Sequence, residues 1–222
     1  MLHRMEQAIA GNVRENKSTP LNFANVSRRG FLAGSSAAFA IAAFAGEANA
    51  FARYKTGGDF MPRGLKYDPH IFVSIDPDGT VTLVAHRSEM GTGSRTSLPM
   101  VLADEMGADW AKVKIVQAEG DEEKYGNQDT DGSRSLRHHI QSMRQMGASV
   151  RHMLAQAAAQ KWGVDAASVK VGVHEVTSGS NKAGFGELAA AAMDLPVPEF
   201  EELTCMDESK FRFIGTGEIG IY

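Results

Sequence analysis

Apolar residues recur at intervals of three and four positions over residues 140–158, the longest periodic stretch of the chain. This spacing places them on one face of an α-helix. We expect the helix to continue to about Trp162 and to stop at Gly163, because glycine readily adopts the left-handed conformation that ends a helix. Since such a helix must bury its apolar face, the other elements should pack against it. The face consists of Ile140, Met143, Gly147, Val150, Leu154, Ala157 and Ala158.

Four other segments have the character of β-strands. The β-branched runs 70–75 and 80–86 flank residues 76–79, Asp-Pro-Asp-Gly, which favour a tight turn, so a hairpin is predicted there. Residues 112–118 alternate between charged and apolar side chains, which predicts a strand with one face in water. Residues 169–177 are predicted to form a fourth strand.

Two shorter helices complete the predicted fold. One covers residues 97–106 with Pro99 in its first turn, where the missing N–H of proline does no harm, and the other covers residues 186–193. Strands and helices together predict the α+β class, with a mixed sheet and the long helix packed on it. A chain of 222 residues is long enough for one domain with a proper core and short for two.

The N-terminal region has the pattern of an export signal. Residues 27–32, Ser-Arg-Arg-Gly-Phe-Leu, open an apolar stretch that is too short and too rich in Ala and Ser to span a membrane. Ala48 and Ala50 then form the A-x-A pattern that signal peptidase reads. We therefore predict a twin-arginine signal, with Arg28 and Arg29 as its pair, and export to the periplasm. The alternative is a buried Ala-rich helix with an incidental Arg pair.

The predicted domain organisation has four parts. Residues 1–50 form the signal, and residues 51–69, rich in Gly and Pro, form a linker. Residues 70–195 form the α+β domain. Residues 196–222 form an acidic, irregular tail whose last apolar run is residues 211–214.

Charge and cysteine content exclude several classes of function. Five of the 23 Lys and Arg and three of the 27 Asp and Glu lie in residues 1–50, so residues 51–222 carry 18 basic and 24 acidic side chains, a net charge of -6. Such a domain has no general affinity for nucleic acid. The single cysteine, Cys205, excludes an internal disulfide and a zinc or iron–sulfur site built from cysteines of this chain alone.

Two loops, each at the start of a predicted helix, are the candidate binding elements. The first contains Gly91, Thr92 and Gly93, where glycines let backbone N–H groups approach an anionic ligand. It lacks the further residues of a nucleotide-binding signature, so a tight turn remains the alternative. The second loop offers amide, hydroxyl and guanidinium donors suited to a phosphate or a pterin edge, with a solvated helix cap as the alternative. Its candidate residues are Gly132, Ser133, Arg134 and Ser135.

Three further groups are predicted to be structural. His138 and His139 are adjacent, so they point to different faces of a helix and do not share a metal ion. Cys205 has no basic partner close in sequence that would activate it. The basic residues of the long helix lack interleaved aromatics and are expected to make ion pairs; they are Arg137, Arg144, Arg151 and His152.

Several stretches together carry a family likeness. They are DGTVTLVAHRSEMGTGSRTSLPMVLADEMG from residue 78, KVKIVQAE from 112, KYGNQDTDGSRS from 124 and MRQMGASVRHMLAQAAAQKWG from 143. In this order they resemble the molybdopterin-binding large subunit of the xanthine dehydrogenase and aldehyde oxidase superfamily. The nearest group is the exported one of the isoquinoline 1-oxidoreductase beta subunit and membrane-associated aldehyde dehydrogenases.

The resemblance implies an oxidoreductase that inserts oxygen from water into an aldehyde or an N-heterocycle. It implies a molybdenum-carrying molybdopterin, in the cytosine dinucleotide form, lying against the two glycine loops. It also implies a separate small subunit with two [2Fe-2S] clusters, cytochrome c as a further electron partner, and possible attachment to the membrane.

The chain also departs from the family. Thr92 stands where the family commonly has Gln, and its shorter side chain reaches less far toward the metal's oxo ligand. The family's subunit is much longer, and its glutamate general base lies downstream of anything matched here. Glu218 lies in a segment that does not follow the family pattern, so no catalytic residue and no metal ligand is assigned to this chain.

Two functional hypotheses follow from these observations. The first is the N-terminal portion of a molybdenum hydroxylase large subunit, catalytically incomplete alone and completed by the remainder of that subunit. The second is a free-standing periplasmic module that binds an anionic ligand without catalysis.

Overall fold

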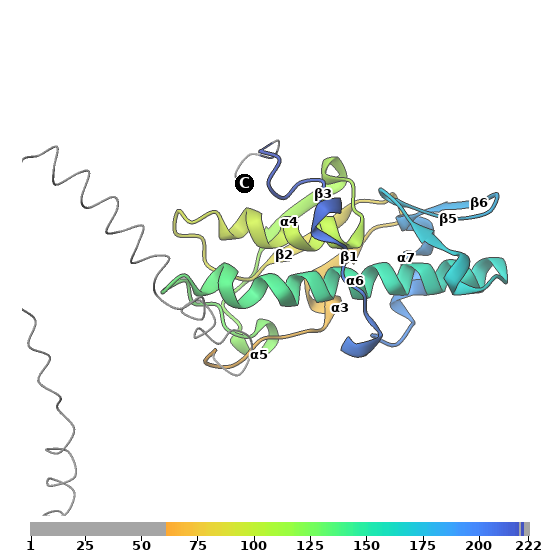
Figure 1. Cartoon of the computed structure of the whole chain (residues 1–222). Helices are drawn as coiled ribbons and strands as arrows, with labels where there is room; N and C mark the ends of the chain where they lie inside the picture. Colours follow the sequence, from red (N-terminus) through yellow and green to blue (C-terminus); the bar gives the residue numbers. More distant parts are fainter. Residues whose placement is uncertain (1–60, 218, 220–222) are drawn as a thin grey trace, which may run out of the picture. The chain divides into compact units, whose positions relative to one another are not determined.

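The computed structural model describes residues 61–217 and residue 219 (Figure 1). Within residues 55–222 these form one compact unit. The predicted signal residues Arg28, Arg29, Ala48 and Ala50 lie outside the described residues. No helix of the described part is long and apolar enough to cross a membrane.

The first sheet has three strands in the order β1-β2-β3. Strand β1 (Val73–Ile75) pairs antiparallel with β2 (Val81–Ala85), and the turn between them is closed by hydrogen bonds from Asp76 N to Thr80 O and from Gly79 N to Asp76 O. The predicted hairpin is therefore confirmed. Strand β3 (Val113–Gln117) runs parallel to β2 and is also confirmed, which makes the sheet mixed. A parallel pair needs a crossover connection, and helix α4 supplies it.

The prediction of a strand from residue 70 was wrong for its first half. Residues Pro69–Phe72 form the short helix α3, and the strand begins only at Val73. Asp68 caps this helix because its carboxylate accepts a hydrogen bond from His70 N at 2.9 Å, and Pro69 occupies the first helical position. These helix-start signals outweigh the β-branched character of the run.

Helices α4 (Ser94–Met106) and α6 (Arg134–Trp162) pack side by side (Figure 1). Gly147 lets their backbones approach, since a Cβ there would lie 2.7 Å from both Leu102 O and Glu105 Cβ. The predicted stop of α6 is confirmed: Gly163 is left-handed, and its N–H donates to the carbonyls of the last turn. Helix α4 begins three residues before the predicted start, so Pro99 lies inside it and not in its first turn.

The predicted fourth strand is in fact two strands. The second sheet contains β4 (Lys170–Val171), β5 (Glu175–Ser178) and β6 (Asn181–Gly184), all antiparallel neighbours. The chain turns between β4 and β5 at His174, whose φ of 59° is left-handed. His174 is held there because its N–H donates to Gly107 O at 2.7 Å.

The remaining elements are short. Helix α7 (Phe185–Met193) confirms the last predicted helix, and α5 (Glu122–Tyr125) lies between β3 and α6 in the chain. The 3-10 helices are η3 (Trp110–Lys112), η4 (Ala166–Ser168), η5 (Phe200–Glu202) and η6 (Glu208–Lys210).

The core lies between the first sheet, α4, α6 and α7, which confirms the α+β class. Six of the seven residues predicted for the apolar face of α6 are buried. Ile140 is the exception: it is 42% exposed, although His138 and His139 just before it on α6 are buried.

Two fully buried carboxylates fasten the C-terminal segment to this core. Asp104 accepts hydrogen bonds from the backbone N–H groups of Arg212 and Phe213 and from Arg212 Nε, all between 3.0 and 3.1 Å. Glu105 forms ion pairs with Arg144 at 3.2 Å and Arg151 at 2.9 Å. The predicted ion-pair role of these two arginines is therefore confirmed.

Candidate functional site

The two predicted loops meet at one pocket, although 40 residues separate them. Helices α4 and α6 both begin there, so the positive ends of two helix dipoles face the same space. Five of the seven predicted binding residues line the pocket, and Gly91 and Gly93 flank it. The pocket has a volume of about 430 Å³ and is lined by Met90, Thr92, Ser94, Thr130, Asp131, Gly132, Ser133, Arg134, Ser135 and Leu136.

The N-terminus of α4 is already occupied by a carboxylate of the chain itself. Glu89 accepts hydrogen bonds from Arg95 N at 2.9 Å and from Gly93 N at 3.0 Å. The backbone N–H of Arg95, followed by those of the glycine loop, lowers the pKa of Glu89 to about 2. Glu89 is therefore ionised at neutral pH. The Gly93 amide, expected to be open to an external anion, is therefore already paired with the Glu89 carboxylate.

The N-terminus of α6 has no such internal cap. Gly132 and Ser133 are both left-handed, with φ of 48° and 58°, and the Ser133 side chain makes no capping hydrogen bond. Arg134 N donates to Asp131 O at 2.8 Å, whereas the next amides of the first turn have no partner within the helix and remain for a ligand in the pocket. The Arg134 side chain, expected to bind an oxyanion, forms an ion pair with Asp131.

Arg87 is a buried cation directly behind this helix start, and sequence reasoning missed it. Its side chain is fully buried. Nη1 donates to Asn127 O at 2.7 Å and to Asn127 Oδ1, and Nε donates to Ser135 Oγ at 3.2 Å. Burial lowers the pKa of Arg87 below its ordinary value. The sequence signal that could have identified Arg87 was its position directly after the predicted strand 80–86, ahead of the glycine loop.

Hydrogen bonds to backbone carbonyls join the segments that lead into the two loops. Thr130 Oγ1 donates to Ser88 O at 2.5 Å, and Gln128 Nε2 donates to His86 O at 3.1 Å. Ser88 N in turn donates to Gln128 O at 3.3 Å. The relative position of the two loops is therefore set by hydrogen bonds as well as by the packing of α4 on α6.

Two buried histidines lie beneath the pocket. The rings of His86 and His139 are 4.8 Å apart between centroids, and His139 Nδ1 lies 3.1 Å from Ser135 O. Burial lowers the pKa of His86 well below its ordinary value and that of His139 to about 4, so both rings are neutral at pH 7. His138 is buried as well, which agrees with the structural role predicted for the adjacent pair.

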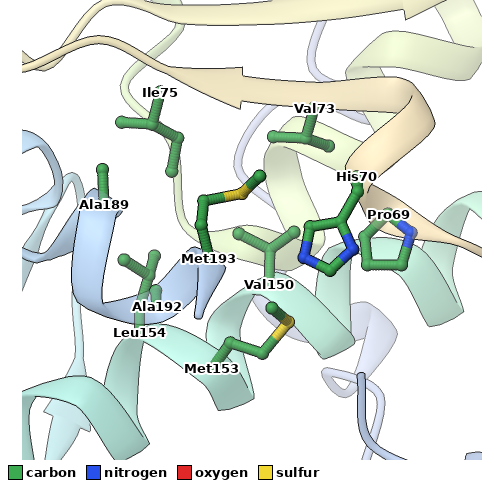
Figure 2. A pocket seen from close by; sticks show the side chains of 10 residues that line it. All are labelled: Pro69, His70, Val73, Ile75, Val150, Met153, Leu154, Ala189, Ala192 and Met193. Carbon is green, nitrogen blue, oxygen red and sulfur yellow. The ribbon is translucent and has the colours of Figure 1, made fainter. Parts of the chain in front are cut away.

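A second cavity is small and apolar (Figure 2). It has a volume of about 30 Å³ and lies between α3, β1, α6 and α7. His70 is the one polar side chain among its lining residues, and its Nδ1 lies 3.0 Å from Asp68 Oδ1. A cavity of this size holds only a few water molecules. Two hollows between α6 and the C-terminal segment are as large or larger, but the pocket between the two loops gathers five of the seven predicted binding residues and is therefore the candidate functional site.

The described part of the chain offers neither a metal site nor an activated cysteine. No group of three or more His, Cys, Asp or Glu there is placed to hold a metal ion. Cys205 is half-buried, and burial raises the pKa of its thiol, which makes it a weaker nucleophile.

Known proteins resemble this chain over part of their length. Membrane-bound aldehyde dehydrogenase (pyrroloquinoline-quinone) of Gluconacetobacter polyoxogenes is 32% identical over 199 residues, which are 88% of this chain and 26% of that protein. Isoquinoline 1-oxidoreductase subunit beta of Brevundimonas diminuta is 34% identical over 139 residues, 59% of this chain and 17% of that protein. The chain thus spans about a quarter or less of these curated relatives.

Solved structures resemble it more distantly. Quinoline 2-oxidoreductase from Pseudomonas putida 86 has 23% identity and a TM-score of 0.45 over 55% of this chain and 16% of that one. The Cu,Mo-CO dehydrogenase has 22% identity and a TM-score of 0.46 over 54% of this chain and 15% of that one.

The sequence model of one family covers most of the chain. It describes a molybdopterin cofactor-binding domain and matches residues 35–215. The chain therefore belongs to the molybdopterin cofactor-binding domain family.

Proposed function

We propose that this chain forms part of the cofactor pocket of an exported molybdenum hydroxylase that oxidises aldehydes or N-heterocycles. The observation that carries the proposal is that both predicted loops meet at one pocket, at the start of α6, lined by hydroxyl and guanidinium donors. Molybdopterin is a large anionic group, and positive helix ends with hydrogen-bond donors suit such a group.

The residues of the pocket fit the cofactor in donor type. Thr92, Ser133 and Ser135 offer hydroxyls, and the first turn of α6 offers backbone N–H groups. Arg87 adds a buried positive charge behind them. When bound, the cofactor supplies the molybdenum centre at which oxygen from water reaches the substrate. The part played by this chain is to bind and orient the cofactor.

We propose that this chain is catalytically incomplete alone, and both carboxylates at the described pocket, Glu89 and Asp131, are engaged in other interactions. Glu89 is bound by backbone amides and is ionised down to a pH of about 2. Asp131 is paired with Arg134. A base with a pKa near the working pH would have to come from elsewhere in the enzyme.

The partners in this proposal are those that the family resemblance implies. We propose that the remainder of the large subunit completes the pocket and that a small [2Fe-2S] subunit, with cytochrome c beyond it, removes the electrons. We propose the cytosine dinucleotide form of the cofactor, a periplasmic location after twin-arginine export, and association with the membrane. The domain boundaries at residues 50, 69 and 195 belong to the same proposal.

The test is co-expression of this chain with the missing part of the large subunit and the iron–sulfur subunit. The purified complex should contain molybdenum and release a pterin. A complex that assembles without either would refute the enzyme assignment. Binding of a simple anion by that metal-free complex would instead support the periplasmic binding module.

A further inference from the structure

The first sheet ends on one side at β1 and on the other at β3. Helices α3 and α7 pack against β1. Helix α4 packs on one face of β3, and β2 occupies one of its two edges. The other edge of β3 pairs with no strand of the described chain. A further strand can join the sheet at this open edge.

The register with β2 fixes the direction of the backbone groups of β3. Ala118 N donates to Ala85 O at 2.9 Å, and the parallel pairing covers the whole of β3. Backbone groups of successive residues in a strand point to opposite sides, so those of residues 114 and 116 face β2, like the N–H of Ala118. The N–H groups of Ile115 and Gln117 therefore point to the open edge. Neither makes a hydrogen bond to another part of the described chain.

β3 lacks the features that protect an open edge. Natural proteins blunt such edges with proline, bulges, very short strands or several charged residues. β3 has five residues without a proline, pairs with β2 without a bulge and carries one charge, on Lys114. Val116 is 44% exposed, and Ile115 is only half-buried. We therefore expect this edge to be covered in the complete protein.

The C-terminal segment lies close to β3 but is bonded elsewhere. Arg212 and Phe213 donate to Asp104 of α4, and the ring of Phe213 lies 5.8 Å from that of Trp110, just before β3. A strand for the open edge must therefore come from outside the described residues. The chain spans about a quarter or less of its curated relatives, so most of a protein of their length is available to supply it.

We propose that an extended segment from the remainder of the large subunit pairs with the open edge of β3 as a fourth strand. The proposal rests on the proposed function, because it takes that remainder as the partner. The N–H groups of Ile115 and Gln117 donate to the added strand, and pairing of this kind depends on backbone groups more than on side chains. The added strand is apolar on the face toward α4, since it extends the face that carries Val113 and Ile115.

The position of the added strand suits the completion of the pocket. β2 and β3 are parallel, so their carboxyl ends lie at the same side of the sheet. β2 leads into the loop of Gly91 and Gly93, and β3 leads toward the loop of Gly132 and Ser133. A fourth strand beside β3 has one of its ends at this side. The residues next to that end lie near the pocket.

The test compares amide hydrogen exchange in the chain alone and in its complex with the remainder of the large subunit, both prepared without the cofactor. The amides of Ile115 and Gln117 should exchange fast in the chain alone. In the complex each should slow by at least about a hundredfold, as expected for hydrogen bonds within a sheet. Ala118 N is bonded to Ala85 in both states, so its exchange should change less.

A pair of variants separates backbone pairing from side-chain contact. Ile115→Pro removes the outward N–H and keeps the hydrogen bonds between β2 and β3, since Ile115 N takes no part in them. Ile115→Ala is the matched control, because it loses the same side-chain contacts and keeps the N–H. The proline variant should bind the remainder at least about tenfold more weakly than the alanine variant. Thermal unfolding checks that both are folded, and the exchange measurement on the unaltered chain needs neither.

Four results would overturn the fourth strand. They are failure of the chain to bind the remainder, unchanged exchange of Ile115 and Gln117 in the complex, equal affinity of the two variants, and protection of these amides in a dimer of this chain alone. The last result would assign the edge to a second copy.

The outcome is distinguishable from that of the proposed function. A complex that protects the edge but takes up no molybdenum when the cofactor is supplied would keep the fourth strand and refute the cofactor assignment. A molybdenum-loaded complex in which Ile115 and Gln117 still exchange fast would do the reverse.

Discussion

Acid should destabilise this protein through the buried histidines beneath the pocket. His139 has an ordinary pKa of 6.5, and burial lowers its pKa in the folded chain to about 4. Between these values the unfolded chain binds more protons than the folded chain, so folding stability falls as the pH falls. Above the unfolded pKa both states are neutral and this effect vanishes. Below the folded pKa both are protonated and the penalty is complete.

The size of the effect follows from the two pKa values. Near pH 5 the unfolded imidazole is almost fully protonated and the folded one is almost fully neutral. The linkage relation then gives a loss of about 2 kcal/mol from His139 between pH 7 and pH 5. His86 contacts His139, and burial lowers its pKa as well, so the pair should lose more than His139 alone.

The assay is denaturant unfolding at pH 7 and at pH 5, for the unaltered chain and for His139→Gln. The variant loses the titrating group, so its stability should drop by about 2 kcal/mol less between the two pH values. His152→Gln, elsewhere on α6, controls for the loss of an imidazole from this helix. An identical pH dependence in the unaltered chain and in His139→Gln would refute the reasoning.

Three further predictions concern other parts of the chain. Gly147→Ala should destabilise the fold by about 1–3 kcal/mol in denaturant unfolding, since its Cβ would lie 2.7 Å from a backbone oxygen of α4; an open helical site would gain stability from the same change. Glu89→Gln should speed hydrogen exchange at the amides of Gly93 and Arg95, and an unchanged rate would show that the carboxylate does not hold the loop. Replacing both Arg28 and Arg29 by Lys should keep the protein out of the periplasmic fraction, and continued export would contradict the twin-arginine prediction.

Local patterns predicted most of the regular structure correctly. The spacing that ends at Gly163 identified α6, and the Asp-Pro-Asp-Gly turn identified the β1–β2 hairpin. The predictions were wrong where a helix cap or a tertiary contact outweighed the strand propensity of a segment. The Asp68 cap and Pro69 turned the start of a β-branched run into α3, and the contact of His174 with Gly107 split a predicted strand in two.

The sequence likewise predicted only part of the candidate site. Glycines and hydrogen-bond donors at predicted helix starts identified both loops. The sequence did not reveal the roles of Arg87 and Glu89. Arg87 matters because it is buried behind Ser135, 48 residues away, and no sequence window contains both. Glu89 lies beside the glycine loop, yet only the backbone conformation of Gly91 and Gly93 turns the amides toward its carboxylate.

The sequence by itself determined the α+β class, the long helix, the two loops and the family, because periodicity, turn chemistry and motif order are local properties. Tertiary structure alone decided that the two loops share one pocket, that one helix start is already neutralised and the other is open, and that a buried guanidinium lies behind the open one. These facts depend on distances between residues far apart in the chain, which are set by the close packing of α4 on α6 at Gly147.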